Sequence, residues 1–124
     1  MNFRKNNPAA LRFAERRRRE DEAPRLSTEA PDLVSLRLEI EEQGGSAQPK
    51  YIRRIVVDTA PALFFLPCGD PRCVDGGHDV TASVMQAIRC HTESFDGTDD
   101  CFGSIGSSPC ARVIHFNAVA EYQT

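Results

Sequence analysis

Four cysteines in two turn-rich segments constrain this 124-residue chain more than any other feature. The first segment, Cys68 to Cys73, reads Cys-Gly-Asp-Pro-Arg-Cys, and the second, Cys101 to Cys110, reads Cys-Phe-Gly-Ser-Ile-Gly-Ser-Ser-Pro-Cys. Glycine, proline, aspartate and serine favour turns, and tetrahedral thiolate coordination of a metal takes side chains from two such turns. The sequence therefore predicts a structural zinc (Zn2+) site with the ligands Cys68, Cys73, Cys101 and Cys110.

Two further residues, His78 and Cys90, compete as ligands. Residues 79–91 between them have helical spacing of apolar side chains, which places His78 and Cys90 about 18 Å apart at 1.5 Å per residue. Ligands of one zinc ion lie within about 4 Å of each other, so these two cannot bind the same ion. Cys90 also lies away from the centre of the apolar face, and we interpret it as a small boundary hydrophobe. His78 stays as a substitute for one cysteine or as a second-layer group beside a ligand.

The cysteine spacing leaves other uses open, because C-x4-C and C-x8-C are wider than the C-x2-C pairs of many zinc sites. One alternative is a set of buried cysteines without metal. A second is a redox dithiol at Cys68 and Cys73, although C-x-x-C is the usual redox pattern. A third is an iron–sulfur cluster, although the plant-type pattern needs a cysteine where Gly76 stands. Zinc is the interpretation that we prefer.

The cysteine content also bears on the compartment. No apolar run approaches 18 residues, and the N-terminus lacks the apolar core of a secretory signal. We therefore expect a cytoplasmic protein, in which thiols stay reduced and cysteines are better explained by metal binding than by disulfides. The odd count of five cysteines leaves at least one outside any even pairing.

Charge is distributed unevenly along the chain. Residues 1–25 hold eight Lys and Arg against four Asp and Glu, whereas the rest of the chain holds seven against fourteen. We expect residues 1–32 to form a flexible or partly helical basic arm, with a helix beginning near Pro8 and a linker from Pro24 to Pro31. Its arginine run is the candidate contact to a nucleic acid or an acidic protein surface, and consists of Arg16, Arg17, Arg18 and Arg19.

Residues 33–124 have the pattern of one small domain. Apolar and charged residues alternate over residues 36–41, and residues 51–57 are rich in strand formers, with a glycine-rich turn between them that predicts a hairpin. Further strands are expected at residues 62–66 and 112–122. We therefore expect an α+β fold, with an antiparallel sheet of three to four strands, one packed helix and a zinc clip.

Two details of this domain are open to test. The predicted helix at residues 79–91 presents an apolar face made of Val80, Val84, Ala87, Ile88 and His91. The acidic stretch at residues 95–100 lacks the 12-residue calcium pattern and is expected to be a solvated loop.

The order of an N-terminal arm, a hairpin, a Cys pair followed by Gly-Gly-His78, a helix, and a second Cys pair before a last strand resembles small bacterial zinc-binding proteins without an assigned activity. The cysteine segments also look somewhat like a zinc ribbon or treble clef, from which the wide spacings depart. The resemblance covers residues 33–124 and implies a zinc-stabilised domain.

The expected function is a non-enzymatic, zinc-stabilised domain that binds a protein or RNA partner through the arm. The alternative is an enzyme that uses His78 beside a metal with an open coordination position. Four thiolate ligands would close the site, which favours the first interpretation.

Overall fold

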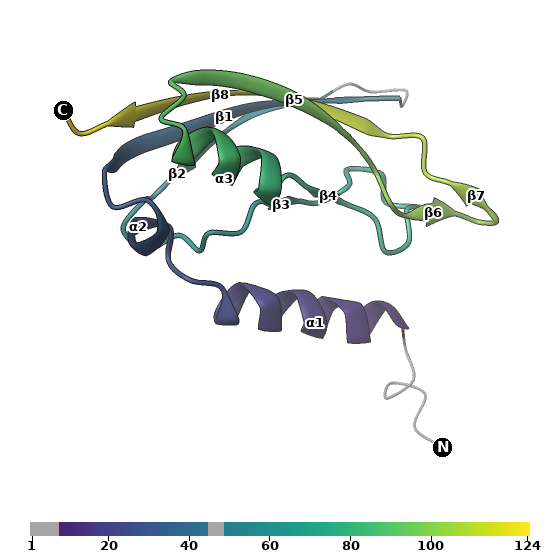
Figure 1. Ribbon diagram of the computed structural model, residues 1–124. Coiled ribbons are helices and arrows are strands. Elements are labelled where there is room, and N and C mark those ends of the chain that lie inside the picture. The colour runs from purple at the N-terminus through teal and green to yellow at the C-terminus, as the bar shows by residue number, and fades with distance from the viewer. Residues whose placement is uncertain (1–7, 45–48) are drawn as a thin grey trace.

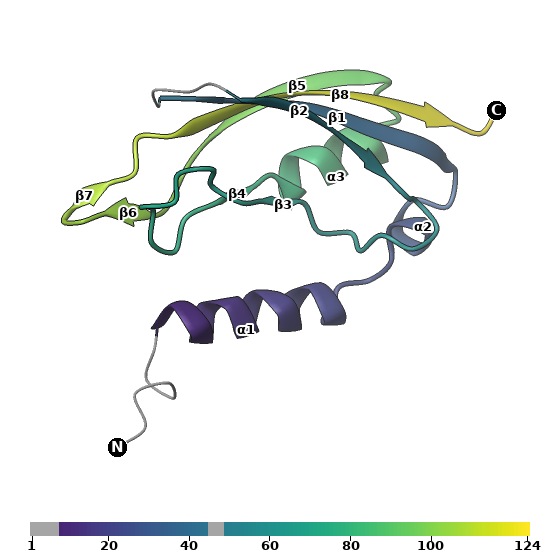
Figure 2. The ribbon, with the colours of Figure 1, turned by 180° about the vertical axis from the view of Figure 1, so that it is seen from behind.

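The computed structural model describes the backbone of residues 8–44 and 49–124, and the side chains from Ala14 onward within these ranges. Three layers are visible in Figures 1 and 2. The first is a four-stranded antiparallel sheet in the order β2 (Lys50–Ile55), β1 (Leu33–Gln43), β8 (Val113–Tyr122) and β5 (Ser94–Asp100). The second holds helix α3 (Thr81–Arg89) and the two-stranded pair β3 (Phe65–Leu66) and β4 (His78–Asp79). The third is helix α1 (Pro8–Glu22).

The remaining elements are short. Helix α2 (Leu26–Glu29) connects α1 to the sheet, and a small hairpin of β6 (Ser104–Ile105) and β7 (Ser108–Pro109) projects at the end of the molecule opposite the C-terminus (Figure 1). None of the described helices is long and apolar enough to cross a membrane.

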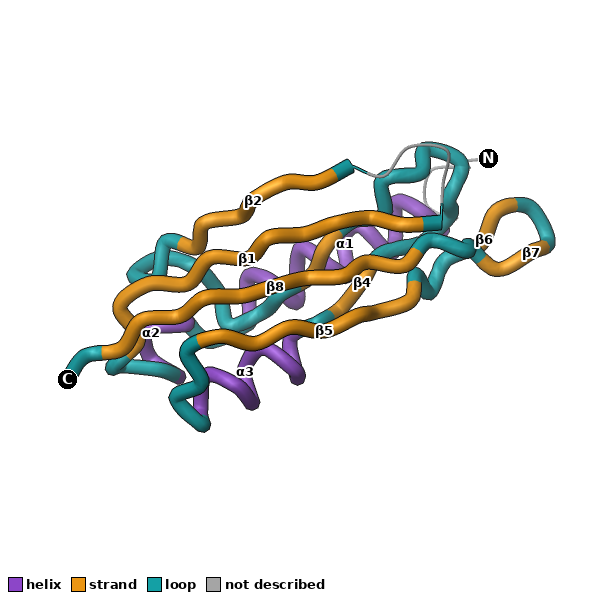
Figure 3. The backbone as a smooth tube through the Cα atoms, turned by 90° about the horizontal axis from the view of Figure 1, so that it is seen from above, coloured by secondary structure: helices purple, strands orange, loops and turns teal. Residues whose placement is uncertain are grey.

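The sheet confirms the predicted fold class, an α+β domain built on antiparallel strands. Figure 3 shows its four strands side by side, with β1 and β8 in the centre. Leu38 faces Ala118 and Ile40 faces Phe116 across this central pair, and all four are buried. Because side chains alternate along a strand, their neighbours point to the opposite face, which is open to solvent.

Helix α3 covers the buried face of the sheet. Val80, Val84 and Ile88 share one apolar core with the inward residues of β1 and β8, as predicted, and Met85 joins them. His91 does not belong to this face: its side chain is 57% exposed and pairs with Asp32. The helix ends at Arg89, and the backbone of His91 takes a positive φ of 52°, which turns the chain away from the core.

The prediction of a loop at residues 95–100 is wrong, because this stretch is strand β5. Aspartate and glycine are disfavoured in strands, but β5 pairs with β8 from Ser94 to Asp100 and Phe95 packs against the core. Gly97 has a packing reason, since a Cβ there would lie 2.8 Å from the ring of Phe116. Pairing and packing therefore outweigh local preference. The predicted strand at residues 62–66 is shortened to the two residues of β3.

The stretch predicted as a linker, Pro24 to Pro31, contributes two residues to the core. Leu26 is fully buried and Ala30 is 5% exposed, both within the same apolar cluster as the sheet. Backbone bonds connect Leu26 N–H to the Ala60 carbonyl and Ala62 N–H to the Pro24 carbonyl. The packed domain therefore begins before residue 33.

Helix α1 lies against the body through polar and aromatic contacts. The Arg16 guanidinium stacks over Phe65 at 3.9 Å from the ring centroid, and Arg19 lies 3.6 Å from the Asp79 carboxylate. Arg17 and Arg18 are exposed, and Arg18 pairs with Glu15. Two of the four arginines of the run, Arg16 and Arg19, thus contact the body outside α1.

Candidate metal centre

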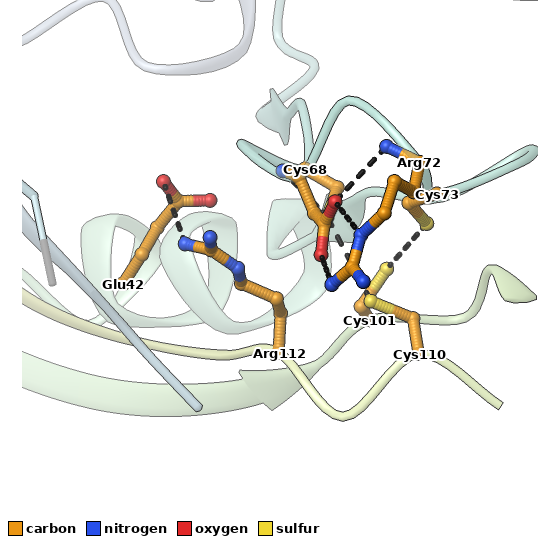
Figure 4. A network of polar contacts seen from close by, with 8 residues as sticks. Glu42, Cys68, Arg72, Cys73, Cys101, Cys110 and Arg112 are labelled. Atoms are coloured by element: carbon orange, nitrogen blue, oxygen red, sulfur yellow. Dashed lines mark hydrogen bonds and ion pairs between the residues drawn. The ribbon is translucent and has the colours of Figure 1, made fainter. Parts of the chain in front are cut away.

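The side chains of the four predicted cysteines converge (Figure 4). Cys68 lies two residues after β3 and Cys73 in the turn that follows, whereas Cys101 comes directly after β5 and Cys110 directly after β7. Their sulfur atoms all lie within 4.8 Å of one another, although up to 42 residues separate them in the sequence. The arrangement can hold one metal ion.

The sulfur separations fit a single tetrahedral ion. Cys68 Sγ lies 3.8 Å from Cys110 Sγ, and Cys73 Sγ lies 3.6 Å from Cys101 Sγ. A tetrahedron with metal–sulfur bonds of about 2.3 Å has edges of about 3.8 Å. All five cysteines are free thiols in the structure. In an iron–sulfur cluster the thiolates bind different iron atoms and stand further apart, so this geometry favours one ion over a cluster.

Backbone N–H groups point at two of the sulfurs. Gly77 N–H and Gly103 N–H donate to Cys101 Sγ at 3.3 and 3.4 Å, and Asp70 N–H donates to Cys68 Sγ at 3.5 Å. Such donors stabilise negative charge on sulfur and orient a ligand toward its metal. The structure thus supplies outer hydrogen bonds as well as a set of ligands.

The pKa values of the thiols show that Cys68 and Cys73 resist ionisation while no cation is bound. Burial raises the pKa of the Cys68 thiol to about 11, and burial also raises the pKa of Cys73. Burial acts in the same direction on Cys101, but the N–H groups of Gly103 and Gly77, together with the neighbouring thiols, outweigh it and lower the pKa of that thiol. Several thiolates this close repel one another unless a positive ion lies between them.

Two glycines allow the cysteine segments to approach. A Cβ on Gly76 would lie 2.7 Å from Cys101 Sγ and would also collide with Cys73 Sγ. A Cβ on Gly103 would lie 2.5 Å both from Cys73 Sγ and from the Cα of Gly76. Val74 and Ser104 join the same two segments through a pair of backbone hydrogen bonds of 2.8 and 3.1 Å.

Each cysteine segment is also held internally. In the first, Cys73 N–H donates to the Asp70 carbonyl, and the Asp70 carboxylate accepts hydrogen bonds from the backbone and guanidinium of Arg72. The Arg72 side chain accordingly lowers the pKa of Asp70 to about 2. In the second, Cys110 N–H donates to the Gly103 carbonyl across the small hairpin. These bonds hold the turns in the shape that brings the sulfurs together.

Glu42 connects the centre to the sheet, and sequence reasoning missed it. Its buried carboxylate accepts a 2.7 Å hydrogen bond from Gly69 N–H, next to Cys68, and lies 3.8 Å from the guanidinium of Arg112, two residues after Cys110 (Figure 4). A signal was present, because the alternation of Leu36, Leu38 and Ile40 continues to position 42 and places a carboxylate on the inward face.

His78 is not among the residues whose ligand atoms come together. Its ring is fully buried, and Nδ1 lies 3.0 Å from the carbonyl oxygen of Asp99 and 3.6 Å from its carboxylate. Nε2 has no hydrogen-bond partner among the described residues. The structure therefore places His78 as a core residue that connects β4 to β5, and the backbone of its neighbour Gly77 is what reaches a sulfur.

Cys90 also lies outside the cluster, at the C-terminal end of α3. Its side chain is exposed rather than packed as a boundary hydrophobe. The five cysteines thus divide into four that converge and one that faces solvent.

No family model, curated protein or solved structure matches this chain. The candidate metal centre therefore rests on the geometry of the chain's own residues.

Proposed function

We propose that this protein is a non-enzymatic, zinc-stabilised domain of the cytoplasm that binds a macromolecular partner. The observation that carries the proposal is the convergence of four sulfurs within 4.8 Å. Four thiolates close a tetrahedral site, so the ion has no open position for water or substrate and serves the fold. A reducing compartment keeps such thiols available for the metal.

Zinc suits this site better than the alternatives. It accepts tetrahedral thiolate coordination without a redox change. The site clips together two segments that have little regular structure, since β3, β4, β6 and β7 have two residues each. A small domain gains most from a metal at such a place.

The test is metal analysis and thiol counting on the full chain, purified under reducing conditions. We expect one zinc ion per chain, and rapid alkylation of Cys90 alone in the native protein. Cys101→Ser should lose the zinc, whereas the matched variant Cys90→Ser should keep it. If the purified protein contained no stoichiometric metal, the proposal of a structural metal would be refuted. If it contained one iron ion per chain, the metal of the site would be iron instead of zinc.

The partner is proposed to bind at α1. Arg17 and Arg18 are exposed there, and the arm is the basic part of an otherwise acidic chain. Arg16 and Arg19 support this role indirectly, because their contacts with Phe65 and Asp79 hold the helix on the body. A polyanionic surface, such as RNA or an acidic protein, is the partner that arginines on a helix attract.

Charge reversal tests the arm. The double variant Arg17→Glu, Arg18→Glu should weaken binding of single-stranded RNA or poly-glutamate at least ten-fold, measured by fluorescence anisotropy at low salt. The matched control is Arg89→Glu, which reverses an exposed arginine on α3. Equal binding by both variants would exclude α1 as the binding element.

A further inference from the structure

The outer edge of the sheet at β2 is open. β2 is the first strand in the order β2-β1-β8-β5, and no other segment in the described part of the chain pairs with its free side. Five of its six residues are exposed, from Lys50 to Arg54. Every second backbone N–H and C=O on that side faces solvent, so this edge can accept a further strand.

Basic side chains are concentrated around this edge. Residues 26–124 hold only seven Lys and Arg in total, and four of these lie on β1 and β2: Arg37, Lys50, Arg53 and Arg54. β2 itself carries no acidic residue. The nearby carboxylates are those of Glu41, 3.7 Å from Lys50, of Glu39, 3.8 Å from Arg37, and of Glu121, which lines one groove with Arg37 and Arg54. The edge is therefore a basic strip on an acidic body.

The placement of Arg37 and Arg54 indicates a role beyond protection of the edge. Charged residues on edge strands commonly prevent aggregation, but Arg37 belongs to the central strand β1. It stands directly opposite Arg54 in the register of the sheet, and like charges in that position destabilise a strand pair. Glu39 and Glu121, the latter in the same groove of about 410 Å³ as Arg37 and Arg54, offset part of this repulsion, and a carboxylate bound beside Arg54 on the free edge would offset more of it.

The opposite edge of the sheet, β5, is not equally open. The ring nitrogen Nδ1 of buried His78 lies 3.0 Å from the carbonyl oxygen of Asp99, which closes that end of β5. A second copy of this chain is also a poor occupant of β2, because two β2 edges would bring their basic residues together. The open, basic edge thus fits a partner with acidic side chains.

We propose that β2 binds an extended acidic segment of a partner protein, which adds as a fifth strand at the edge of the sheet. Lys50 and Arg54 face carboxylates of the added strand, as does Arg53, whose guanidinium also donates to the Phe65 carbonyl at 3.4 Å. The exposed side chains of Tyr51 and Ile52 face apolar residues. Peptide is favoured over nucleic acid because the edge offers backbone hydrogen bonds as well as charge. The surface is distinct from α1, so the inference goes beyond the proposed function and does not depend on it.

The register of β2 specifies a probe. Read against residues 55 to 50, an antiparallel partner takes the run Val-Glu-Glu-Val-Val-Glu, and a parallel partner takes its reverse. A fluorescein-labelled peptide with each run between Gly-Ser flanks is titrated with the full chain as purified. We expect saturable binding of one of the two, and at least ten-fold weaker binding of the rearranged run Glu-Glu-Glu-Val-Val-Val. The double variant Arg53→Glu, Arg54→Glu should likewise bind at least ten-fold more weakly.

Two further measurements test the mode and the place of binding. N-methylation at alternate peptide bonds should abolish binding in one phase of alternation and spare it in the other, because an added strand bonds through one side only. Arg17→Glu, Arg18→Glu in α1 should bind the peptide as the unaltered chain does, which separates this surface from the arm. The milder variant Arg54→Gln replaces the double reversal if the latter fails to fold.

Several results would overturn the proposal. Absence of binding by both runs would do so, as would binding that is indifferent to N-methylation or to the order of the residues. RNA binding that depends on Arg53 and Arg54, without peptide binding, would assign the edge to nucleic acid. Self-association in sedimentation that Arg53→Glu, Arg54→Glu disrupts would assign it to a second copy.

Discussion

Gly76 and Gly103 control how closely the four sulfurs can approach, although neither has a side chain. Each lies where a single added carbon would collide with a cysteine sulfur. Metal ligands are usually sought among residues whose side chains carry donor atoms. Here two glycines, which have no side chain, leave the space that the cysteine sulfurs occupy. The close approach of the sulfurs therefore requires the absence of a Cβ at these two positions.

Replacement of Gly76 by alanine should therefore damage the metal centre. The new Cβ would displace the sulfurs of Cys73 and Cys101, and we expect at least a ten-fold loss of zinc affinity in competition with a chromogenic chelator. The matched control is Gly106→Asn, because Gly106 has open space around its Cα and a φ of +62° that asparagine tolerates. Unchanged affinity in Gly76→Ala would show that the sulfurs do not bind metal in this arrangement.

The thiols should give the metal-free and metal-bound protein opposite responses to pH. Burial raises the pKa of Cys68 from an ordinary value of 9.0 to about 11, so the stability that this neutral thiol contributes to the metal-free fold is complete below about pH 9 and lost as pH rises toward 11. The zinc-bound form needs thiolates, so protons compete with the metal and stability falls on acidification. Thermal denaturation of both forms from pH 5 to 11 measures this difference, and parallel profiles would contradict it.

At the scale of elements, Glu42 holds the end of β1 to both cysteine segments. Glu42→Ala leaves Gly69 N–H and the partly buried Arg112 without their partner, and we expect the free energy of unfolding to fall by about 3 kcal/mol. Glu42→Gln should cost less, because an amide oxygen can still accept from Gly69. Chemical denaturation measures both, with the exposed Glu39→Gln as control; equal stability of all three variants would exclude this role.

Helix α1 should separate from the body when its two anchoring arginines are removed. A helix of 15 residues is only marginally stable alone in water, and Arg16 and Arg19 provide its contacts with Phe65 and Asp79. Arg16→Ala, Arg19→Ala should therefore raise amide exchange throughout α1 at least ten-fold without changing β1 or β8. The matched variant Arg17→Ala, Arg18→Ala should leave exchange in α1 within two-fold, and equal effects of the two pairs would count against docking through Arg16 and Arg19.

How well the elements could be predicted from the sequence depended on whether local pattern and packing agreed. Strands β1 and β8 alternate cleanly, and the apolar spacing in α3 matches a helix, so these were predicted. β5 carries Gly97 and several aspartates, and its pairing with β8 is a long-range effect that no local pattern contains. Leu26 was missed for a similar reason, since a single apolar residue between prolines resembles a linker until its packing is known.

For the whole molecule, the sequence was sufficient to select which cysteines meet but not how the fold holds them. Helix length showed that His78 and Cys90 cannot share one ion, and the position of Cys90 away from the apolar face set it aside; the sulfur distances agree with the choice of the other four. The sequence could not place His78, because its Nδ1 contacts the backbone carbonyl of Asp99, twenty-one residues away. Nor could it reveal that Arg16 would be used on the chain's own Phe65.

Removal of the metal should loosen one end of the molecule and leave the other folded. The apolar core lies between the sheet and α3, and the buried cysteines are not members of that cluster. Under the proposed zinc site, the cysteine segments are expected to depend on the ion, whereas β1, β8 and α3 are expected to depend on buried apolar area. Phe65, on which α1 docks, packs on Gly77 beside Cys101, so α1 belongs with the loosened part.

Amide exchange on the chelator-treated, reduced protein measures this division. We expect protection to fall at least ten-fold in residues 66–77, 101–112 and α1, and to persist in the centres of β1, β8 and α3. Restoring one equivalent of zinc should restore all three regions together. If chelation left the protection of all amides unchanged, the ion would have no structural role. If chelation removed protection throughout the chain, the sheet and α3 would be unable to keep their core without the bound metal.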